Sequence, residues 1–432
     1  MDKISFCINT ARNEINHIKL LFKSLEQNLY SKKHEIIVFI DSDNQGTFEW
    51  LLTQKSTFPN LKILKNELPI CYGYARNINE MFEQAENEIV SYLQSDMVIG
   101  KDYDLEVLKS LTPNTILCST RVEPPLHPPS PEKITYDFGL DPIKFNLDSW
   151  TQFSIKSKQN KITSYFFAPF TLYKKDWIQI GGHNTLYRRS REDSDVLLRL
   201  ILSGIDIKQT WSSLVYHFTC TSSRGPVWFD KNNQEAQQRL QLQQLADRYE
   251  LIRFIKNWGK FSHGDLSNEG YLPPKFYKIS AIIKNIPNIP EFLNIETFFD
   301  KVYVEDPSII PLIQNSYNNE HKIANQLFNI SEEDWEKYNY MYNQQSAQDR
   351  IKSLNNLQEE DILIEFDLTQ ISNNDISEFI SQLQLIIDQT EDIGKFQYGP
   401  FNINITRKVD RAKDKIKITN PKIKKEHLYK IF

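Results

Sequence analysis

The stretch EIIVFIDSD, residues 35–43, decides the fold class of this chain. After Glu35 comes an unbroken β-branched and apolar run as far as Ile40, followed by acidic side chains at Asp41 and Asp43. A run without polar alternation is typical of a strand buried on both faces, as in parallel sheets that helices cover on both sides. We therefore predict an α/β fold built on a mostly parallel sheet.

The sequence on both sides of this run alternates between strand and helix patterns. Short apolar runs predict strands, and apolar residues at helical spacing predict the helices between them. Such alternation implies crossover connections and parallel pairing. The elements predicted in this way are strands over residues 4–8, 61–64 and 88–93 and helices over residues 15–25 and 74–85.

Further along the chain the pattern is less regular. Residues 122–133, VEPPLHPPSPEK, contain too many prolines for a helix or a central strand, so we expect an ordered loop that borders the site. Strand-like patterns return over residues 162–173 and 213–218, and the second of them carries His217. Residues 232–256 have the apolar spacing of a long helix.

The length of 432 residues suits two or three domains. We predict a first domain over residues 1–230, a helical and loop extension over residues 231–350, and a small α/β module with a basic tail over residues 351–432. Within the module we expect a strand over residues 361–368, a helix over residues 376–387 and a strand over residues 401–406.

Composition limits the class of partner. The formal net charge of −5 gives no reason to expect a nucleic acid. The four cysteines form no zinc or dithiol motif, and no apolar stretch is long enough to span a bilayer. We therefore expect a cytoplasmic protein. The Lys- and Arg-rich tail from Arg407 to Phe432 is either a solvated tail or a segment that suits peripheral contact with an anionic membrane surface or with a nucleic acid.

Polar residues stand where the predicted strands end. Thr10, Asp41 and Asp96 all lie at such ends, and α/β sheets bind ligands beyond the carboxyl ends of their strands. A second group of carboxylates lies in REDSDVLLRL, residues 191–200, at the start of a helical pattern. The helix dipole alone favours acidic residues there, so a catalytic site and a plain helix start are both open.

Five segments, in this order, together resemble glycosyltransferase family 2 over roughly residues 3–225. This family comprises inverting enzymes with a GT-A fold, a mostly parallel, Rossmann-like sheet flanked by helices. The segments are INTARNE at 8–14, FIDSDNQGT at 39–47, GYARNIN at 73–79, YLQSDMVIG at 92–100 and GGHNTLYRRSREDSD at 181–195.

The resemblance implies a role for residues in each segment. Asp193 would be the catalytic base, with Glu192 supporting the acceptor, and Gly181, Gly182 and Asp195 would lie on the acceptor side. The nucleobase, the nucleoside and the diphosphate would be bound by the earlier segments. The residues expected to bind the nucleotide sugar are Thr10, Arg12, Asn13, Glu14, Asp41, Asp43, Arg76, Gln94, Ser95 and Asp96.

The chemistry of such a transfer explains these residue types. Breaking the anomeric bond leaves a nucleoside diphosphate with developing negative charge, which a divalent cation stabilises. Mg²⁺ and Mn²⁺ prefer oxygen ligands, so we expect Asp96 to ligate the ion, with His217 as an imidazole ligand that favours Mn²⁺. An acceptor hydroxyl also needs a base during attack. Gln94 stands where the family most often has an acid, so one carboxylate contact is lost.

We therefore expect an inverting, metal-dependent glycosyltransferase. The donor would be a nucleoside diphosphate sugar, by default a UDP-sugar, and the acceptor a hydroxyl of a glycan, a lipid-linked saccharide or a protein. Two other functions remain open: a non-catalytic glycan- or partner-binding protein on the same fold, and a sugar nucleotidyltransferase. The second usually has a glycine-rich first loop, which the segment TARNEIN at 10–16 lacks.

Several of these residues also have structural explanations. Asp41 could cap the following helix, His217 could be a core histidine, and Arg76 could pair with a carboxylate on its own helix. Trp150, Trp211 and Trp228 could stack on sugar rings or pack in the core. Arg224 could reach a diphosphate or lie on the surface.

Overall fold

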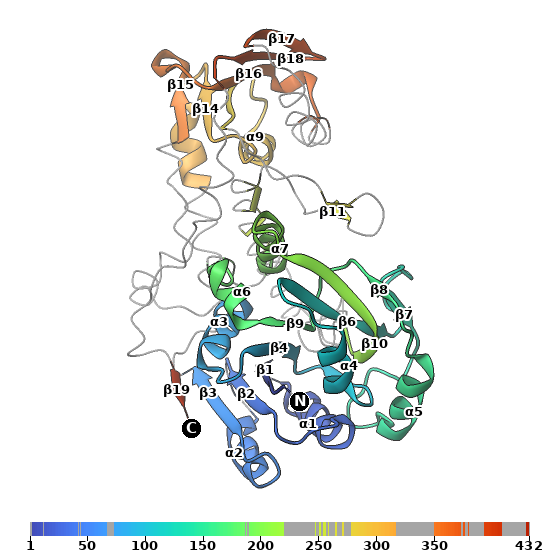
Figure 1. The fold of residues 1–432 in the computed structure, drawn as a ribbon. Helices are drawn as coiled ribbons and strands as arrows, with labels where there is room; N and C mark the ends of the chain where they lie inside the picture. Colours follow the sequence, from blue (N-terminus) through green and yellow to red (C-terminus); the bar gives the residue numbers. More distant parts are fainter. Residues whose placement is uncertain are drawn as a thin grey trace.

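A computed structural model of the chain shows an 11-stranded sheet, a 6-stranded sheet and a two-stranded ribbon (Figure 1). The ribbon pairs β11 (Gly264–Asp265) with β12 (Gly270–Tyr271). The structure describes residues 2–11, 13–41, 43, 45–66, 73–185, 187, 190–219, 247, 250–251, 254–255, 258, 264–265, 270–271, 278–316, 350–372, 375, 379, 393–407 and 429–431.

The larger sheet has the strand order β19-β3-β2-β1-β4-β9-β6-β10-β5, with β7 beside β6 and β8 beside β10. The run at residues 35–40 is one of its inner strands and is buried along its whole length, as predicted. The strands are β1 (Ile4–Thr10), β2 (Glu35–Ile40), β3 (Leu61–Asn66), β4 (Ile89–Gln94), β5 (Met97–Ile99), β6 (Thr115–Glu123), β7 (Lys133–Thr135), β8 (Ile162–Thr163), β9 (Phe170–Tyr173), β10 (Asp206–His217) and β19 (Tyr429–Ile431).

Parallel pairing brings several carboxyl ends to one edge of this sheet. Strands β3, β2, β1 and β4 are parallel neighbours, and β6 and β10 are parallel too. In register, Thr10 is opposite Ile40 and Asn9 is opposite Gln94. Strand β9 is antiparallel to β4 and β6, and β5 is antiparallel to β10. The predicted α/β class with a mostly parallel sheet is confirmed.

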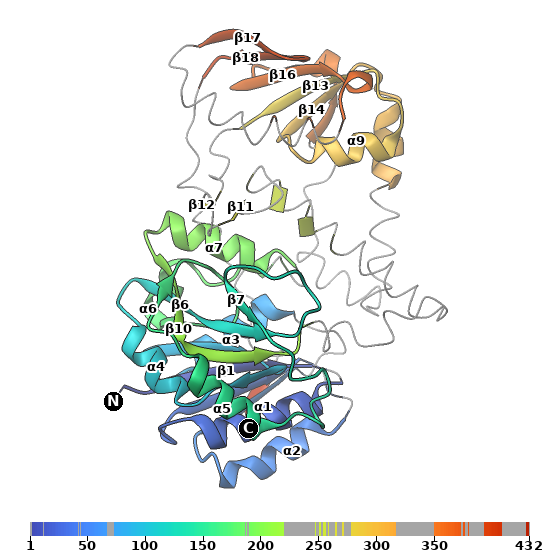
Figure 2. The ribbon, with the colours of Figure 1, turned by 90° about the vertical axis from the view of Figure 1, so that its right-hand side faces the viewer.

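Helices cover both faces of the sheet (Figure 2). Side chains alternate along β1, so Phe6 packs in the cluster that contains residues of α1, α2 and α4, while Cys7 packs with residues of α3, α6 and α7. The helices of this domain are α1 (Ile15–Asn28), α2 (Thr47–Thr53), α3 (Tyr74–Gln84), α4 (Tyr103–Ser110), α5 (Leu147–Ser157), α6 (Lys174–Gln179) and α7 (Glu192–Leu202), with a 3₁₀ turn at Gln54–Ser56.

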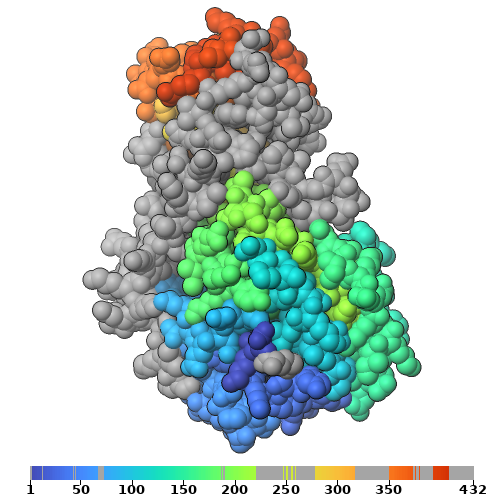
Figure 3. Space-filling model, viewed as in Figure 1, coloured from blue at the N-terminus to red at the C-terminus, as the bar shows by residue number. Residues whose placement is uncertain are grey.

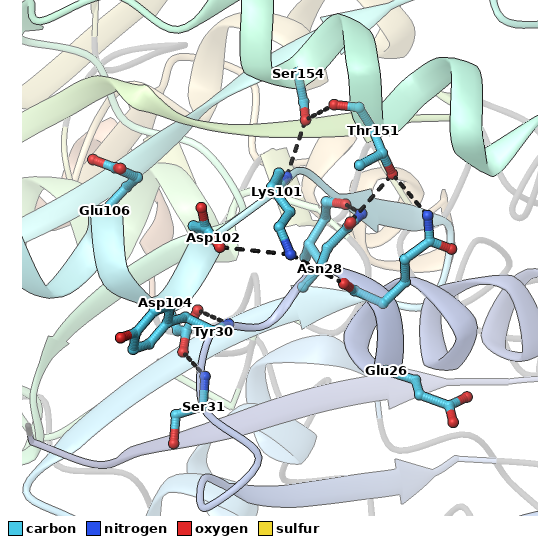
Figure 4. Close-up of polar contacts among 12 residues, drawn as sticks. Glu26, Asn28, Tyr30, Ser31, Lys101, Asp102, Asp104, Glu106, Thr151 and Ser154 are labelled. Carbon is cyan, nitrogen blue, oxygen red and sulfur yellow. Dashed lines mark hydrogen bonds and ion pairs between the residues drawn. The ribbon is translucent and has the colours of Figure 1, made fainter.

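Polar contacts fasten α1 and α5 to the connection between β5 and α4 (Figure 4). The Thr151 hydroxyl donates to Asn28 Oδ1 at 3.2 Å, and the Lys101 N–H donates to Ser154 Oγ at 3.0 Å. The Asp104 carboxylate accepts two backbone N–H groups from the turn after α1, at 2.8 and 2.9 Å. These contacts satisfy polar groups beneath the sheet and fix its helical layer in place.

The 6-stranded sheet has the order β15-β14-β13-β16-β18-β17, parallel from β15 to β16 and antiparallel beyond. Its surface is drawn in orange and red in Figure 3. Its core contains apolar residues of β13, β14, β15, β16, β18 and α9, and the partly buried Phe396 of β17 packs against it. Its elements are β13 (Ser280–Lys284), α9 (Ile289–Glu296), β14 (Lys301–Val304), β15 (Ile351–Ser353), β16 (Ile362–Asp367), β17 (Gly394–Tyr398) and β18 (Phe401–Ile405), with 3₁₀ turns at Leu354–Asn356 and Leu368–Gln370.

This sheet corrects the predicted domain boundary at residue 351. Strands β13 and β14, from the segment expected to hold short helices and loops, pair directly with each other and with β15 and β16. The short strand β19 also leaves the C-terminal module and pairs with β3 of the larger sheet. The boundary was missed because four- and five-residue strands between prolines give little periodic signal.

Other predicted elements differ in extent. Residues 162–173 form two short strands, β8 and β9, instead of one, and residues 213–218 are mostly the end of a longer strand, β10. Most of residues 232–256 and 376–387, and the tail over residues 408–428, lie outside the described residues. Among the described helices, none combines the length and apolar character needed to cross a membrane.

Candidate functional site

The candidate site lies at the carboxyl edge of the larger sheet, where β1, β4, β6 and β10 end. The turn between β4 and β5 contains Ser95 and Asp96, and β10 ends at His217 beside the first residue of β5. This pairing brings Asp96 and His217 together: the Asp96 Oδ2 atom lies 3.8 Å from the His217 Nε2 atom. Both residues are buried, so the pair forms a small polar centre beneath the surface.

The other side of the His217 ring faces a carboxylate that the sequence analysis did not single out. Glu123, the last residue of β6, accepts a hydrogen bond from His217 Nδ1 at 2.8 Å. Lys133 Nζ and Arg121 Nη1 lie 3.0 and 3.4 Å from the same carboxylate. Burial alone would raise the pKa of Glu123, but the His217 hydrogen bond and the Arg121 charge lower it to about 2. A strand-end acid was a signal that could have identified Glu123, as it identified Asp96.

Glu14 joins the ends of β1 and β4. Its Oε2 atom accepts hydrogen bonds from the Thr10 hydroxyl at 3.2 Å, the Ala11 N–H at 2.9 Å and the Ser95 hydroxyl at 2.5 Å. Burial raises the pKa of Glu14 to about 7, although the Ser95 hydrogen bond opposes the shift. Asn13, at the turn before Glu14, has a φ of 65°. Predicted residues of the first segment are therefore adjacent to Asp96, while Arg12 lies outside the described residues.

Asp41 and Asp43 bond to the protein itself. The Asn66 amide donates to Asp41 Oδ1 at 3.1 Å and the Gly73 N–H donates to Asp41 Oδ2 at 3.0 Å, which ties the end of β2 to β3 and to the start of α3. Asp43 accepts backbone N–H groups from Gln45 and Phe48, both at 3.0 Å, at the start of α2. The start of the following helix is thus held by Asp43, whereas these contacts of Asp41 join β2 to β3 and to the start of α3.

The helix α3 carries Arg76, which is buried, toward the same edge. Its neighbour Asn77 donates from Nδ2 to Asn9 Oδ1 at 2.7 Å and so fixes α3 to β1. Gln94 ends β4 and is partly exposed. Trp150 and Trp211, for which core packing was the alternative to contact with a sugar, are buried. Trp150 donates from Nε1 to the Ile99 carbonyl at 3.0 Å, and Trp211 donates from Nε1 to Thr163 Oγ1 at 2.9 Å.

Helix α7 begins with the two predicted catalytic carboxylates. Asp193 is exposed, and its Oδ1 atom accepts the Ser194 N–H at 2.6 Å. Burial, followed by the charges of Asp193 and Glu250, raises the pKa of Glu192 well above its usual range. The buried Glu192 Oε2 atom has no hydrogen-bond partner within the described part of the chain. An unpaired buried oxygen is costly unless a ligand supplies a donor.

The start of α7 lies near the end of β4. Burial, then Tyr74 and then Glu192, raise the pKa of the Tyr92 hydroxyl, and Asp96 contributes in the same direction. Glu192 and Asp96 therefore both act on the Tyr92 side chain of β4, although 96 positions separate these two residues in the sequence.

The loop before α7 is held by side chains that the sequence analysis missed. Asn79 on α3 donates from Nδ2 to the His183 carbonyl at 2.9 Å and accepts the His183 N–H at 2.8 Å. The His183 Nδ1 atom lies 3.2 Å from the Glu192 carbonyl oxygen and donates to it. Burial and the Arg199 charge lower the pKa of His183 to about 3, so the ring is a neutral structural donor.

The predicted acceptor-side residues divide into two kinds. Gly181 and Gly182 form the loop, with φ of 76° and 67°. Asp195 is fully buried: its Oδ2 atom lies 2.8 Å from Arg199 Nη2, and its Oδ1 atom accepts the Trp258 N–H at 2.9 Å. Arg199 in turn donates to the Gly182 carbonyl. Asp195 thus supports the loop from inside, and the structure does not place it where an acceptor could touch it.

The described residues contain no cluster of three or more His, Cys, Asp or Glu side chains that could hold a metal ion. Asp96 and His217 are a two-residue donor set, which suits an ion that takes its other ligands from substrate phosphates and water. Arg224 and Trp228 lie outside the described residues.

Comparison with known protein families gives a match over part of the chain. Residues 7–190 match the family described as Glycosyl transferase family 2, which is the family that the sequence segments resemble. The match ends before Glu192, Asp193 and His217. No curated protein matches the chain.

Solved structures of similar shape include the following three proteins. TarS of S. aureus is 14% identical, with a TM-score of 0.38 over 59% of this chain and 45% of that one. GalNAc-T7, solved with UDP, GalNAc and Mn²⁺, is 11% identical, with a TM-score of 0.40 over 57% and 51%. The mannosyltransferase PcManGT of Pyrobaculum calidifontis, solved with GDP-Man and Mn²⁺, is 14% identical, with a TM-score of 0.38 over 58% and 64%. The chain spans about half the length of the first two.

Proposed function

We propose, given that residues 7–190 form a domain of glycosyl transferase family 2, that the chain transfers a sugar from a nucleoside diphosphate sugar to a hydroxyl group with inversion at the anomeric carbon. The default donor is a UDP-sugar, and the acceptor is a hydroxyl of a glycan, a lipid-linked saccharide or a protein. The observation that carries the proposal is the approach of Asp96 Oδ2 to His217 Nε2, 3.8 Å apart at the carboxyl edge of the sheet.

The donor set at this edge fits Mn²⁺ or Mg²⁺. A carboxylate oxygen and an imidazole nitrogen are both ligands for Mn²⁺, and two ligands each about 2.1 Å from one ion lie roughly 3–4 Å apart. Asp96 and His217 would hold the ion, and Gln94 would supply at most a neutral amide oxygen. When bound, the ion neutralises charge that develops on the leaving diphosphate.

The two carboxylates of α7 divide the acceptor chemistry between them. Asp193 is exposed and oriented by the Ser194 N–H, as a base that receives the acceptor proton must be. Glu192, whose pKa burial raises, can exchange hydrogen bonds with a sugar hydroxyl through its unpaired buried oxygen. A single in-line displacement at the anomeric carbon then gives inversion.

The first test measures the melting temperature of the full chain with UDP, GDP, dTDP, CDP or CMP, each with and without Mn²⁺. A ligand at a hundred times its dissociation constant stabilises the folded state by roughly 2.7 kcal/mol, which is a visible shift. We expect a metal-dependent shift with one nucleotide, and we expect Asp96→Asn to lose the metal-dependent part. No shift with any nucleotide would contradict the proposed donor site.

The second test separates an enzyme from a binding protein. We expect Asp193→Asn to keep the nucleotide and metal shift but to lose sugar transfer and donor hydrolysis by at least 100-fold, the scale of a general base. Asp206→Asn, a change at another exposed aspartate at the far end of β10, is the control and should keep both. Equal turnover in the two variants would exclude Asp193 as the base, and turnover absent from the unaltered protein would favour a non-catalytic role.

A further inference from the structure

We infer that Glu123 is a positioning residue for His217, which holds the imidazole in the one tautomer and orientation that can ligate a divalent cation together with Asp96. The inference rests on the proposed function, because it concerns the same metal centre. Neither the sequence segments nor the family match assigns Glu123 a role.

The hydrogen bond between Glu123 and His217 fixes where the ring carries its proton. A carboxylate only accepts hydrogen bonds, so the 2.8 Å contact places the proton on His217 Nδ1. The Nε2 atom is then the ring nitrogen that can supply a lone pair to a cation, and it faces Asp96 at 3.8 Å. This distance is too long for a hydrogen bond and fits two ligands of one ion.

Two cations hold the Glu123 carboxylate in place. Strand β7 pairs with β6 so that Lys133 is opposite Arg121, and both cations reach the Glu123 carboxylate, at 3.0 and 3.4 Å. Glu123 is buried. The carboxylate therefore has little freedom to leave His217, and the proline-containing segment that begins after Glu123 brings Lys133 back to it.

The fold does not need this contact to join β6 to β10. The two strands are already paired through their backbones as far as Val122 and Tyr216. The Glu123 side chain takes no part in this backbone pairing. In metal sites, the ring nitrogen of a histidine that does not bind the metal commonly donates its hydrogen to a carboxylate, and removal of that carboxylate costs about 10–100-fold in metal affinity.

The chain offers a matched control at the other end of the sheet. His34, just before β2, contacts Asp104 through Nε2 at 2.8 Å, and both side chains are buried. The pair has the same chemistry and length as His217 with Glu123, but His34 Nδ1 accepts the Ile4 N–H at 3.1 Å and so serves the backbone. Breaking this pair should cost stability alone.

The experiment compares Glu123→Gln with Asp104→Asn in the full chain. The free Mn²⁺ signal in electron paramagnetic resonance gives the Mn²⁺ affinity in the presence of the nucleoside diphosphate that the melting panel selects. We expect Glu123→Gln to weaken Mn²⁺ binding about 10–100-fold, with nucleotide binding unchanged in the absence of metal. Asp104→Asn should lower the melting temperature and leave Mn²⁺ affinity within about twofold of the unaltered protein.

The possible results separate the inference from the function beneath it. Wild-type Mn²⁺ affinity in Glu123→Gln, with affinity lost in His217→Ala, would overturn the role of Glu123 and leave the metal centre intact. No Mn²⁺ binding by the unaltered protein would overturn the metal centre itself. If Glu123→Gln fails to fold, Glu123→Asp keeps the charge facing Lys133 but shortens the reach to His217, and unchanged Mn²⁺ affinity there would also overturn the inference.

Discussion

Gly182→Ala should destabilise the protein far more than the same change at its neighbour Gly181. Both glycines have a positive φ, 67° and 76°, which costs an alanine about 1–2 kcal/mol at either position. They differ in their surroundings. A Cβ atom on Gly182 would lie 2.4 Å from Asn79 Oδ1 and 2.9 Å from Trp177 Nε1, whereas a Cβ on Gly181 meets nothing within 4 Å.

The difference between the two variants gives the magnitude of the contact. Overpacking of this kind costs about 1–3 kcal/mol, so Gly182→Ala should lose about 2 kcal/mol more than Gly181→Ala. For a domain of this size, about 3 °C of melting temperature corresponds to 1 kcal/mol. We therefore expect Gly182→Ala to melt about 6 °C below Gly181→Ala.

The same change should also affect the proposed catalytic carboxylates, Glu192 and Asp193. Asn79 holds both backbone groups of His183, and His183 donates to the Glu192 carbonyl at the start of α7. Displacing Asn79 should therefore lower kcat more than it raises KM, because the shifted group acts in the transition state.

The assays are thermal unfolding and steady-state kinetics of both glycine variants and of each combined with Asn79→Ala. Removing the Asn79 side chain should relieve most of the extra cost of Gly182→Ala, a coupling that a double-mutant cycle measures. Equal melting temperatures for the two glycine variants, or no relief in the Asn79→Ala background, would refute the reasoning.

Three further predictions concern buried charges. Asp195→Asn should cost about 3–5 kcal/mol, because it leaves Arg199 as an uncompensated buried cation; urea unfolding checks this, and a loss under 1 kcal/mol would contradict it. Burial raises the pKa of Glu14 to about 7 from an ordinary value of 4.5, so its contribution to stability is full below about pH 4.5 and is lost as pH rises through 7. Glu14→Gln should therefore reduce the fall in melting temperature between pH 5 and 8, and an unchanged fall would argue against that shift. Glu296→Gln breaks the buried pair with Arg350 in the smaller sheet, 2.7 Å between Nη1 and Oε2, and should also cost about 3–5 kcal/mol while nucleotide binding by the larger sheet, measured by titration, stays unchanged.

The sequence indicated Asp96 and His217, which the structure brings together, but it did not indicate the residues that hold them. Asp96 and His217 lie at the ends of strands, and in the sequence each is a polar residue at the end of an apolar segment. Glu123 has the same position at the end of β6, but the prolines that follow it directly are typical of a loop and hide the end of the strand in the sequence. Asn79 gave no signal, because an amide on a helix with polar neighbours is typical of a solvated face.

The predicted roles of individual carboxylates depended on neighbours that no local pattern contains. Asp195 stands in a cluster with Glu192 and Asp193 in the sequence, yet it points inward to Arg199 and Trp258. Each residue along an α-helix is rotated by about 100° from the one before it, so neighbours in the chain face different surroundings. Which of the three faces the interior is decided by what packs against α7.

The α/β class and the order of the first strands and helices follow from the sequence without the structure, because a strand buried on both faces requires an unbroken apolar run such as residues 35–40. The tertiary structure alone decided that Glu123 meets His217, that Asn79 holds the loop before α7, and that strands from residues 280–304 join those from 351–405 in one sheet. These are contacts between residues far apart in the chain, and their energies arise only when the strands and helices that carry them are packed together.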